Sequence, residues 1–225
     1  MENLEKGILY IVATPIGNMG DITLRAIETL KNVNLILCED TRVTRKLLER
    51  YEIKTPSLSY HQHSKIKRID EIKERLMGGE NMALVTDAGT PGISDPGNIL
   101  VKEVLDNGIS VVPIPGASAI GALISVAGID MQKFIFLGFP PHKKGRQTFF
   151  KEIIDFKYPV IYYDSPHRLL KNLELLKELG YNKNVIVGRE LTKMFEEAVR
   201  GNTDEIIEYF SRKEKIKGEL VVILG

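Results

Sequence analysis

The chain has 225 residues, of which 43% are hydrophobic, and its formal net charge is +1. This length can bury one large core or two medium ones, and the balanced charge excludes a global polycation that binds nucleic acid without specificity. No apolar run approaches the roughly 20 residues of a membrane span, residues 1–10 lack a signal-peptide layout, and the single cysteine, Cys38, excludes an internal disulfide. We therefore expect a cytoplasmic protein without a membrane segment.

The first half alternates strand patterns with helical patterns. Helical spacing is seen in Leu24, Ile27 and Leu30, along residues 66–76, and after residue 97, where Leu100, Val101, Val104 and Leu105 are predicted to share one face. Such alternation is typical of a mostly parallel sheet with covering helices. The strands are predicted at 8–12, 35–38, 82–86 and 110–113. Because PIPG at 113–116 would stop a strand and stiffen the chain, we place the first domain at residues 1–114.

The second half, residues 115–225, reads as a second α/β domain that is rich in strands towards its end. The fold class is therefore α/β, with two α/β domains. Helices are predicted at 117–127, 146–155, 168–179 and 203–212, and strands at 134–138, 159–163, 184–190, 195–199 and 219–224.

Three loops rich in glycine and proline follow strands of the first half. LVTDAGTPGISDPG at 84–97 holds three Gly, two Pro and two Asp; ATPIGNMGD at 13–21 and PIPGAS at 113–118 are of the same kind. Glycine permits close backbone approaches, proline stiffens a turn, and a following helix N-terminus offers unpaired N–H groups. Ligands of α/β proteins bind at the carboxyl ends of strands, so the loops together predict a ligand site there. Neither a Rossmann nor a Walker motif is present.

Charged residues follow two of these strands. Asp87 can accept hydrogen bonds from an ammonium or hydroxyl group of a ligand, or it can serve only as a turn former or helix cap. Glu39, Asp40 and Arg42 can supply a general base and an anion clamp, or they can be an ordinary helix start. His61 and His63 lie two apart, without the further ligands that a metal site requires, so we expect solvated histidines and no metal.

In the second half, a basic run follows GFPP. Lys143, Lys144 and Arg146 surround a glycine in HKKGR, an arrangement that suits RNA phosphate contacts, although most charge runs are solvated surface. Arg168 sits at a predicted helix start, where a cation is unfavourable, which also favours a phosphate role. His167, Glu190 and Lys193 also follow strand patterns of the second half, and we predict that they lie near Arg168 at the same edge of that domain.

Six motifs in chain order resemble those of the tetrapyrrole-methylase-fold (class III) S-adenosylmethionine methyltransferases. They are TPIGN at 14–18, CEDTR at 38–42, TDAGTPGISDPG at 86–97, PGAS at 115–118, GFPP at 138–141 and YDSPHR at 163–168. Within this family the chain most resembles members that methylate a cytidine 2′-hydroxyl of 16S rRNA in the small ribosomal subunit. The match spans nearly the whole chain.

The resemblance implies a fold, a cofactor and a set of residues. It implies two α/β domains with the cofactor cleft between them, S-adenosyl-L-methionine as cofactor, and a homodimer. The positions that match the family's cofactor pocket are Pro15, Gly17, Asp87, Gly89, Ile93 and Ser118. The candidates for catalysis are Glu39, Asp40, Arg42, Glu190 and Lys193, and those for RNA binding are Lys143, Lys144, Arg146 and Arg168.

The chemistry this resemblance implies depends mainly on alignment. The cofactor's sulfonium already activates its methyl group, so the enzyme must align the ribose 2′-oxygen, exclude water and provide a base. Glu39, Asp40, Glu190 or a neutralised lysine could be that base, and the sequence does not choose among them.

Two alternatives to this function stay open at this point. One is a tetrapyrrole-precursor methylase of the same fold, whose members have a GGDP-type loop where this chain has TDAGTP. The other is a noncatalytic cofactor-binding module. Members of the resembled family often continue past KGELVVIL into a small extra domain, whereas this sequence stops at Gly225.

Overall fold

The computed structural model describes residues 5–60, 66–95 and 97–225. The chain folds into two compact units, Met1–Ser118 and Ala119–Gly225, and each is described by itself. The boundary predicted after residue 114 coincides with the end of the last strand of the first unit.

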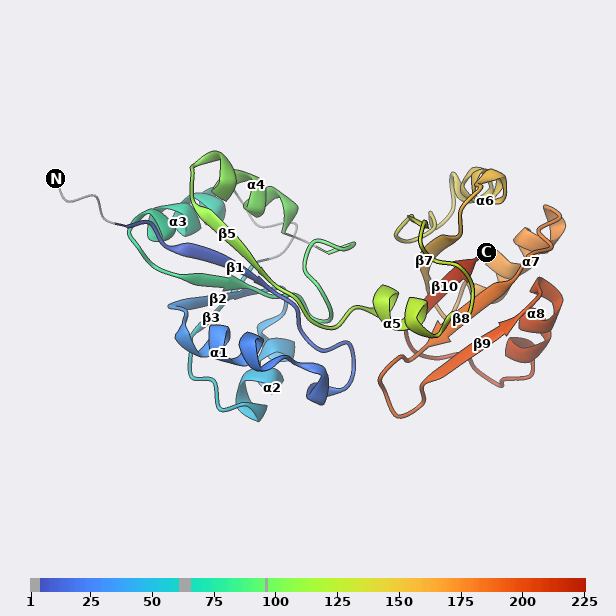
Figure 1. Cartoon of the computed structure of the whole chain (residues 1–225), viewed down its shortest axis with the longest axis horizontal. Coiled ribbons are helices and arrows are strands. Elements are labelled where there is room, and N and C mark those ends of the chain that lie inside the picture. Colours follow the sequence, from blue (N-terminus) through green and yellow to red (C-terminus); the bar gives the residue numbers. More distant parts are fainter. Residues whose placement is uncertain (1–4, 61–65, 96) are drawn as a thin grey trace. The chain divides into compact units, whose positions relative to one another are not determined.

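The first unit is built on a parallel sheet. Its described strands are β1 (Ile8–Val12), β2 (Leu35–Cys38), β3 (Ser57–Ser59), β4 (Met82–Leu84) and β5 (Ser110–Ile114). They lie in the order β3-β2-β4-β1-β5, and every pair is parallel, as the sequence predicted for this half (Figure 1). β3 was not predicted, because its sequence SLS is short and mostly exposed. β4 ends two residues before the predicted strand does, at the start of the glycine-rich loop.

Helices cover both faces of this sheet. α1 (Leu24–Asn32) and α2 (Thr41–Arg50) pack on one face, α3 (Ile66–Met77) and α4 (Asn98–Asp106) on the other (Figure 1). Every residue of β2 is buried, since Leu35 and Leu37 belong to one core and Ile36 and Cys38 to the other. A parallel sheet covered on both sides requires such an uninterrupted apolar strand. One short 3-10 helix, η1 (Met19–Asp21), follows β1.

One residue predicted for the buried face of α4 is placed differently. Leu100 and Val104 are fully buried, but Leu105 is exposed. Residues 100 and 104 are one helical turn apart, whereas residue 105 lies a further 100° around the axis, beyond the edge of the sheet-facing stripe.

The second unit has a mixed sheet, and the strand-rich end predicted for this half forms most of it. β6 (Ile135–Phe136), β7 (Val160–Asp164), β8 (Val185–Arg189), β9 (Glu197–Gly201) and β10 (Leu220–Leu224) lie in the order β6-β7-β10-β8-β9. Only β6 and β7 are parallel; the other three pairs are antiparallel. Between β8 and β9 there is only a short loop, so these strands form a hairpin, which must be antiparallel.

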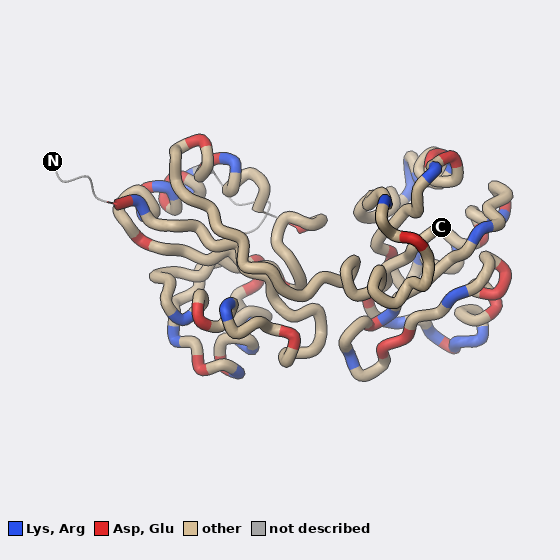
Figure 2. Tube along the Cα trace, viewed as in Figure 1, with Lys and Arg blue, Asp and Glu red and all other residues tan. Residues whose placement is uncertain are grey.

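One large core lies on one face of this second sheet. It joins side chains of α6 (Arg146–Asp155), α7 (Leu169–Glu178) and α8 (Thr203–Ser211) to alternate residues of the strands. α5 (Ala119–Val126) packs on the opposite face, where its Leu123 lies close over Gly188 of β8 (Figure 1). Lys, Arg, Asp and Glu are intermixed along each unit (Figure 2). In the described part of the chain, no helix has the length and apolar character needed to cross a membrane.

Candidate functional site

The three glycine-rich loops meet at one edge of the first sheet. They follow β4, β1 and β5, which are neighbours in the sheet, so their carboxyl ends lie side by side. Thr14 and Gly89 exchange two backbone hydrogen bonds: the Thr14 N–H donates to the Gly89 carbonyl at 2.9 Å, and the Gly89 N–H donates to the Thr14 carbonyl at 3.1 Å. The Thr14 hydroxyl also donates to the Thr86 carbonyl at 3.1 Å. The first and second loops are therefore tied to each other.

Glycine is required where these loops touch. Gly89 has a φ of +82°, and a Cβ at this position would lie 3.3 Å from Cγ2 of Ile16. Close approach and a left-handed backbone both disfavour larger residues there. Ser94 in the same loop has a φ of 61°, which is uncommon for a residue with a side chain.

The third loop joins the same edge. The Thr90 hydroxyl donates to the Ala117 carbonyl at 3.2 Å, and the Ala13 N–H donates to the Ile114 carbonyl at 3.1 Å. The structure thus gathers within one unit every residue predicted to bind cofactor: Pro15, Gly17, Asp87, Gly89, Ile93 and Ser118.

Asp40 serves as the N-cap of α2 and connects the CEDTR segment to this edge. Its side chain accepts from the Arg42 N–H at 2.8 Å, and its own N–H donates to Oδ1 of Asp87 at 3.1 Å. The exposed Arg42 guanidinium pairs with Asp40, and these hydrogen bonds lower the pKa of Asp40 to about 2. A carboxylate so stabilised in its ionised form is a weak base. The helix-start role that the sequence allowed for Asp40 and Arg42 is present in the structure.

Two other carboxylates at this edge have raised pKa values. Burial raises the pKa of Asp95 to about 6, and the neighbouring Glu39 and Asp87 charges act in the same direction. Partial burial also raises the pKa of Asp87, against the hydrogen bond from Asp40. The edge is therefore a place where negative charge accumulates and where a cationic ligand relieves repulsion. Sequence reasoning missed Asp95, because an Asp between turn residues just before a helix is typical of a simple helix cap.

Glu190 and Lys193 form a compact charged cluster in the second unit. Lys193 donates to Oε1 of Glu190 at 2.8 Å and to Glu219 at 3.2 Å, and the Glu219 N–H donates to the same Oε1 at 3.0 Å. Burial alone raises the pKa of Glu190, but these hydrogen bonds outweigh it and the pKa is lowered. Burial lowers the pKa of Lys193, yet its carboxylate partners raise it overall. The cluster therefore holds an ion pair and not a neutral lysine.

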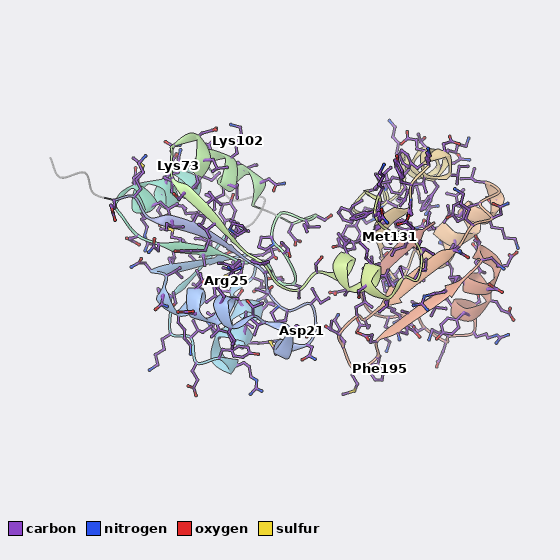
Figure 3. All side chains as sticks on the ribbon, viewed as in Figure 1. Asp21, Arg25, Lys73, Lys102, Met131 and Phe195 are labelled. Atoms are coloured by element: carbon purple, nitrogen blue, oxygen red, sulfur yellow. The ribbon has the colours of Figure 1, made fainter. Side chains whose placement is uncertain are left out.

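The backbone around this cluster is unusual. Glu190 has a φ of 50°, and Gly218 has a φ of +95°. A Cβ on Gly218 would overlap the Glu190 carboxyl group, so a larger residue there would displace this carboxyl group and strain the backbone. The loop between β8 and β9 then carries the exposed Phe195 (Figure 3).

The predicted RNA-binding residues lie on two loops at the carboxyl ends of β6 and β7. Arg168 is half-buried and joins the loops, because its Nη1 donates to the Pro140 carbonyl at 3.0 Å and its Nε donates to the Ser165 hydroxyl at 2.9 Å. Lys143 and Lys144 are exposed, and Arg146 begins α6 behind Gly145, which has a φ of 86°. Neither α6 nor α7 has a side-chain cap at its N-terminus.

A buried carboxylate that sequence reasoning missed supports these loops. Asp164 accepts from the Ser165 N–H at 2.7 Å and from Nδ2 of the buried Asn172 at 2.8 Å. Burial raises its pKa, against these hydrogen bonds and the nearby Arg168 and Arg146 charges. Its signal lay in YDSPHR, where an acid ends an otherwise apolar strand.

Among the described residues, no group of three or more His, Cys, Asp or Glu side chains could hold a metal ion. His61 and His63, which we predicted to be solvated, lie outside the described residues.

Comparisons with a family model and with curated proteins both find methyltransferases among the relatives of this chain. The family model of the tetrapyrrole (corrin/porphyrin) methylases matches residues 8–207. The "Ribosomal RNA small subunit methyltransferase I" of Synechocystis is 46% identical, covering 97% of this chain and 79% of its own length. The protein of the same name from Thermotoga maritima is 44% identical, covering 97% and 98%.

Solved structures share the fold at low sequence identity. A diphthine synthase superposes with a TM-score of 0.75 at 12% identity, covering 97% of this chain and 90% of that one. The cobalt precorrin-4 methyltransferase has a TM-score of 0.69 at 16% identity, covering 96% and 94%.

The Asp95 environment predicts a pH-dependent stability. Its folded pKa of about 6 lies above the ordinary 3.8, so ionisation opposes folding: the wild-type protein loses stability as the pH rises from about 4 through about 6. Asp95→Asn removes this loss. Urea unfolding at a series of pH values should show matching midpoints near pH 4 and a more stable variant above pH 6. Equal pH dependence in the two proteins would contradict the assignment.

Proposed function

The chain belongs to the tetrapyrrole methylase family and is a methyltransferase, and we propose that it methylates the 2′-hydroxyl of a cytidine in 16S rRNA of the small ribosomal subunit. One observation carries the proposal: relatives at 43–46% identity over almost the whole chain are small subunit methyltransferases. These relatives favour this function over a tetrapyrrole substrate and over a noncatalytic module.

We propose S-adenosyl-L-methionine as the cofactor, held by the joined loops of the first unit. The ligand carries a sulfonium and an ammonium group, and the edge formed by Asp87, Asp95 and Glu39 is acidic. Gly89 keeps the Thr14–Gly89 contact free of side chains, so that backbone can approach a ligand. Asp87, the exposed member of the edge, is proposed to accept hydrogen bonds from the ligand. When bound, the cofactor supplies an activated methyl group.

The remaining candidates divide by protonation state. Glu190 is ionised and stays a candidate base, but its lowered pKa makes it a weak one, as for Asp40. The cationic Lys193 that pairs with it is suited to orienting Glu190 or an anionic group. Glu39 stays a candidate base, while Asp40 and Arg42 are proposed to shape the loop beside Asp87. Alignment of the 2′-oxygen and exclusion of water supply the rest of the rate enhancement.

RNA is proposed to contact the second unit through Lys143, Lys144, Arg146 and Arg168. Two helices without side-chain caps begin there, and their N–H groups favour anions in the same way as the four cations. Phosphate contacts position an RNA without reading its bases, so a shaped subunit surface is the expected substrate. We place the enzyme in the cytoplasm with its ribosomal substrate.

The chemical product tests the proposed function directly. Small subunits that lack the modification should gain methyl groups from labelled S-adenosylmethionine, and the modified linkage should resist alkaline cleavage because the attacking hydroxyl is blocked. Methyl groups found only on bases would contradict the 2′-hydroxyl assignment.

Asp87→Ala should weaken cofactor binding by about 1–3 kcal/mol if the carboxylate accepts hydrogen bonds from the ligand. Isothermal titration with S-adenosylmethionine and its demethylated product measures this difference. Thr90→Ser keeps the hydroxyl that bonds to the Ala117 carbonyl and is a matched loop control. Unchanged affinity in a folded Asp87→Ala variant would remove Asp87 from the site.

Changing Lys143, Lys144 and Arg146 together to Ala should weaken RNA binding and flatten its salt dependence, because each lost phosphate contact releases about one counterion fewer. Cofactor affinity should not change. Arg25 and Lys102, which are labelled in Figure 3, form with Lys46 a control triple that is exposed on helices of the first unit and gives the same charge change. An unaltered salt slope in the basic-loop variant would contradict this assignment.

We also propose that the protein is a homodimer, as the family resemblance implies. Light scattering at micromolar concentration should give twice the mass of one chain. A mass of one chain would contradict this proposal.

A further inference from the structure

One exposed aromatic side chain, Phe139, lies on the loop that carries the proposed RNA-binding residues of the HKKGR run. Phe139 is 53% exposed, although a phenyl ring normally lies in a core. Its ring contacts Tyr163 at a tilt of 49°, with the ring centroids 5.2 Å apart, and Phe136 packs edge-on against the same Tyr163 at 5.1 Å. Phe139 is therefore held by a neighbouring ring while about half of its surface stays open to solvent.

The backbone holds this ring in place from both sides. Before it, the Tyr163 N–H donates to the Gly138 carbonyl at 2.8 Å, and Gly138 turns the chain with a φ of 64°. After it, the Pro140 carbonyl accepts from Arg168 at 3.0 Å. A ring fixed in this way loses little conformational entropy when a flat partner covers it.

The charges around the ring indicate what that partner is. Phe139 precedes Lys143, Lys144 and Arg146 by a few residues, and its neighbour Pro140 is bonded to Arg168. Phe195 is also exposed, but the cation of its loop, Lys193, is already paired with Glu190 and Glu219, so this loop offers phosphate less positive charge than the HKKGR loop does. An exposed aromatic ring among cations suits an unstacked base whose phosphates lie on those cations.

We propose that Phe139 is a stacking platform for an unpaired nucleotide of the RNA substrate. This inference rests on the proposed function and deepens it, since it assigns substrate binding to a side chain without charge. Tyr163 is the support that orients the ring, and Arg168 fixes the loop that carries it.

Steady-state methylation of small subunits tests the proposal with Phe139→Leu and Phe139→Tyr. Leucine keeps an apolar contact with Tyr163 but has no aromatic face, whereas tyrosine keeps the face. Stacking on one base corresponds to roughly 5- to 150-fold in affinity, so Phe139→Leu should raise the KM for subunits by that factor, with cofactor affinity unchanged. Phe139→Tyr should stay close to wild type. Equal KM values for Phe139→Leu and wild type would overturn the proposal.

Fluorescence gives a readout that does not need turnover. The chain has no Trp, so Phe139→Trp introduces its only Trp, whose emission, excited where the eight Tyr absorb little, should be quenched when a base of the small subunit's RNA stacks on it. Tyr158→Trp is the matched control, because Tyr158 is 40% exposed, lies near Lys133 and precedes the other end of β7. Its emission should not change.

The possible failures are distinguishable. A wild-type enzyme that does not methylate subunits contradicts the proposed function. If the enzyme is active but the emission of Phe139→Trp does not change when small subunits are added, only the stacking role of Phe139 is contradicted. A blue shift of that emission with protein concentration, without RNA, would show that a second copy covers the ring and would also overturn the proposal.

Discussion

The reciprocal backbone bonds between Thr14 and Gly89 are the contact on which the cofactor-side site depends. Two loops separated by about half of the first unit are joined there by paired N–H and carbonyl groups, and the Thr14 hydroxyl adds a bond to the Thr86 carbonyl. Backbone bonds do not depend on side-chain identity, except that they demand close approach, which Gly89 provides. This contact fixes the loop after β4, and that loop carries Asp87 and Asp95 at the edge of the sheet.

Much of the first unit could be predicted from sequence because its signals are local. β1 and β2 occur at the predicted residues, and the apolar run Leu35–Cys38 is the pattern of a strand buried on both faces. β3 could not be predicted, since the short segment SLS becomes a strand only by pairing with β2, and its own sequence carries no strand pattern. In the second unit, the sequence did not predict strand direction, because the antiparallel pairing of β10 with β7 and β8 joins segments far apart in the chain.

The candidate site shows the same division. Glycine and proline patterns identified the loops, because clusters of these residues are typical of turns and are disfavoured inside helices and strands. The protonation states could not be predicted, since they depend on neighbours across the fold: Asp95 is affected by Glu39, and Lys193 by Glu219. The role of Asp164 in holding its loop was likewise missed. Its partner Asn172 lies in α7, whose sequence pattern predicts an apolar buried face and not a polar side chain that bonds to Asp164.

Gly218 and Glu190 also constrain how this sequence can change over time. The glutamate carboxyl group fills the space that a side chain at position 218 would need, so the two positions are not independent. A larger residue at 218 displaces the Glu190 carboxyl group, which loosens one of the two partners of Lys193, and it also strains a backbone with a φ of +95°. The effects of substitutions at 190 and 218 are therefore coupled, and a lineage that keeps this ion pair is expected to favour glycine at 218.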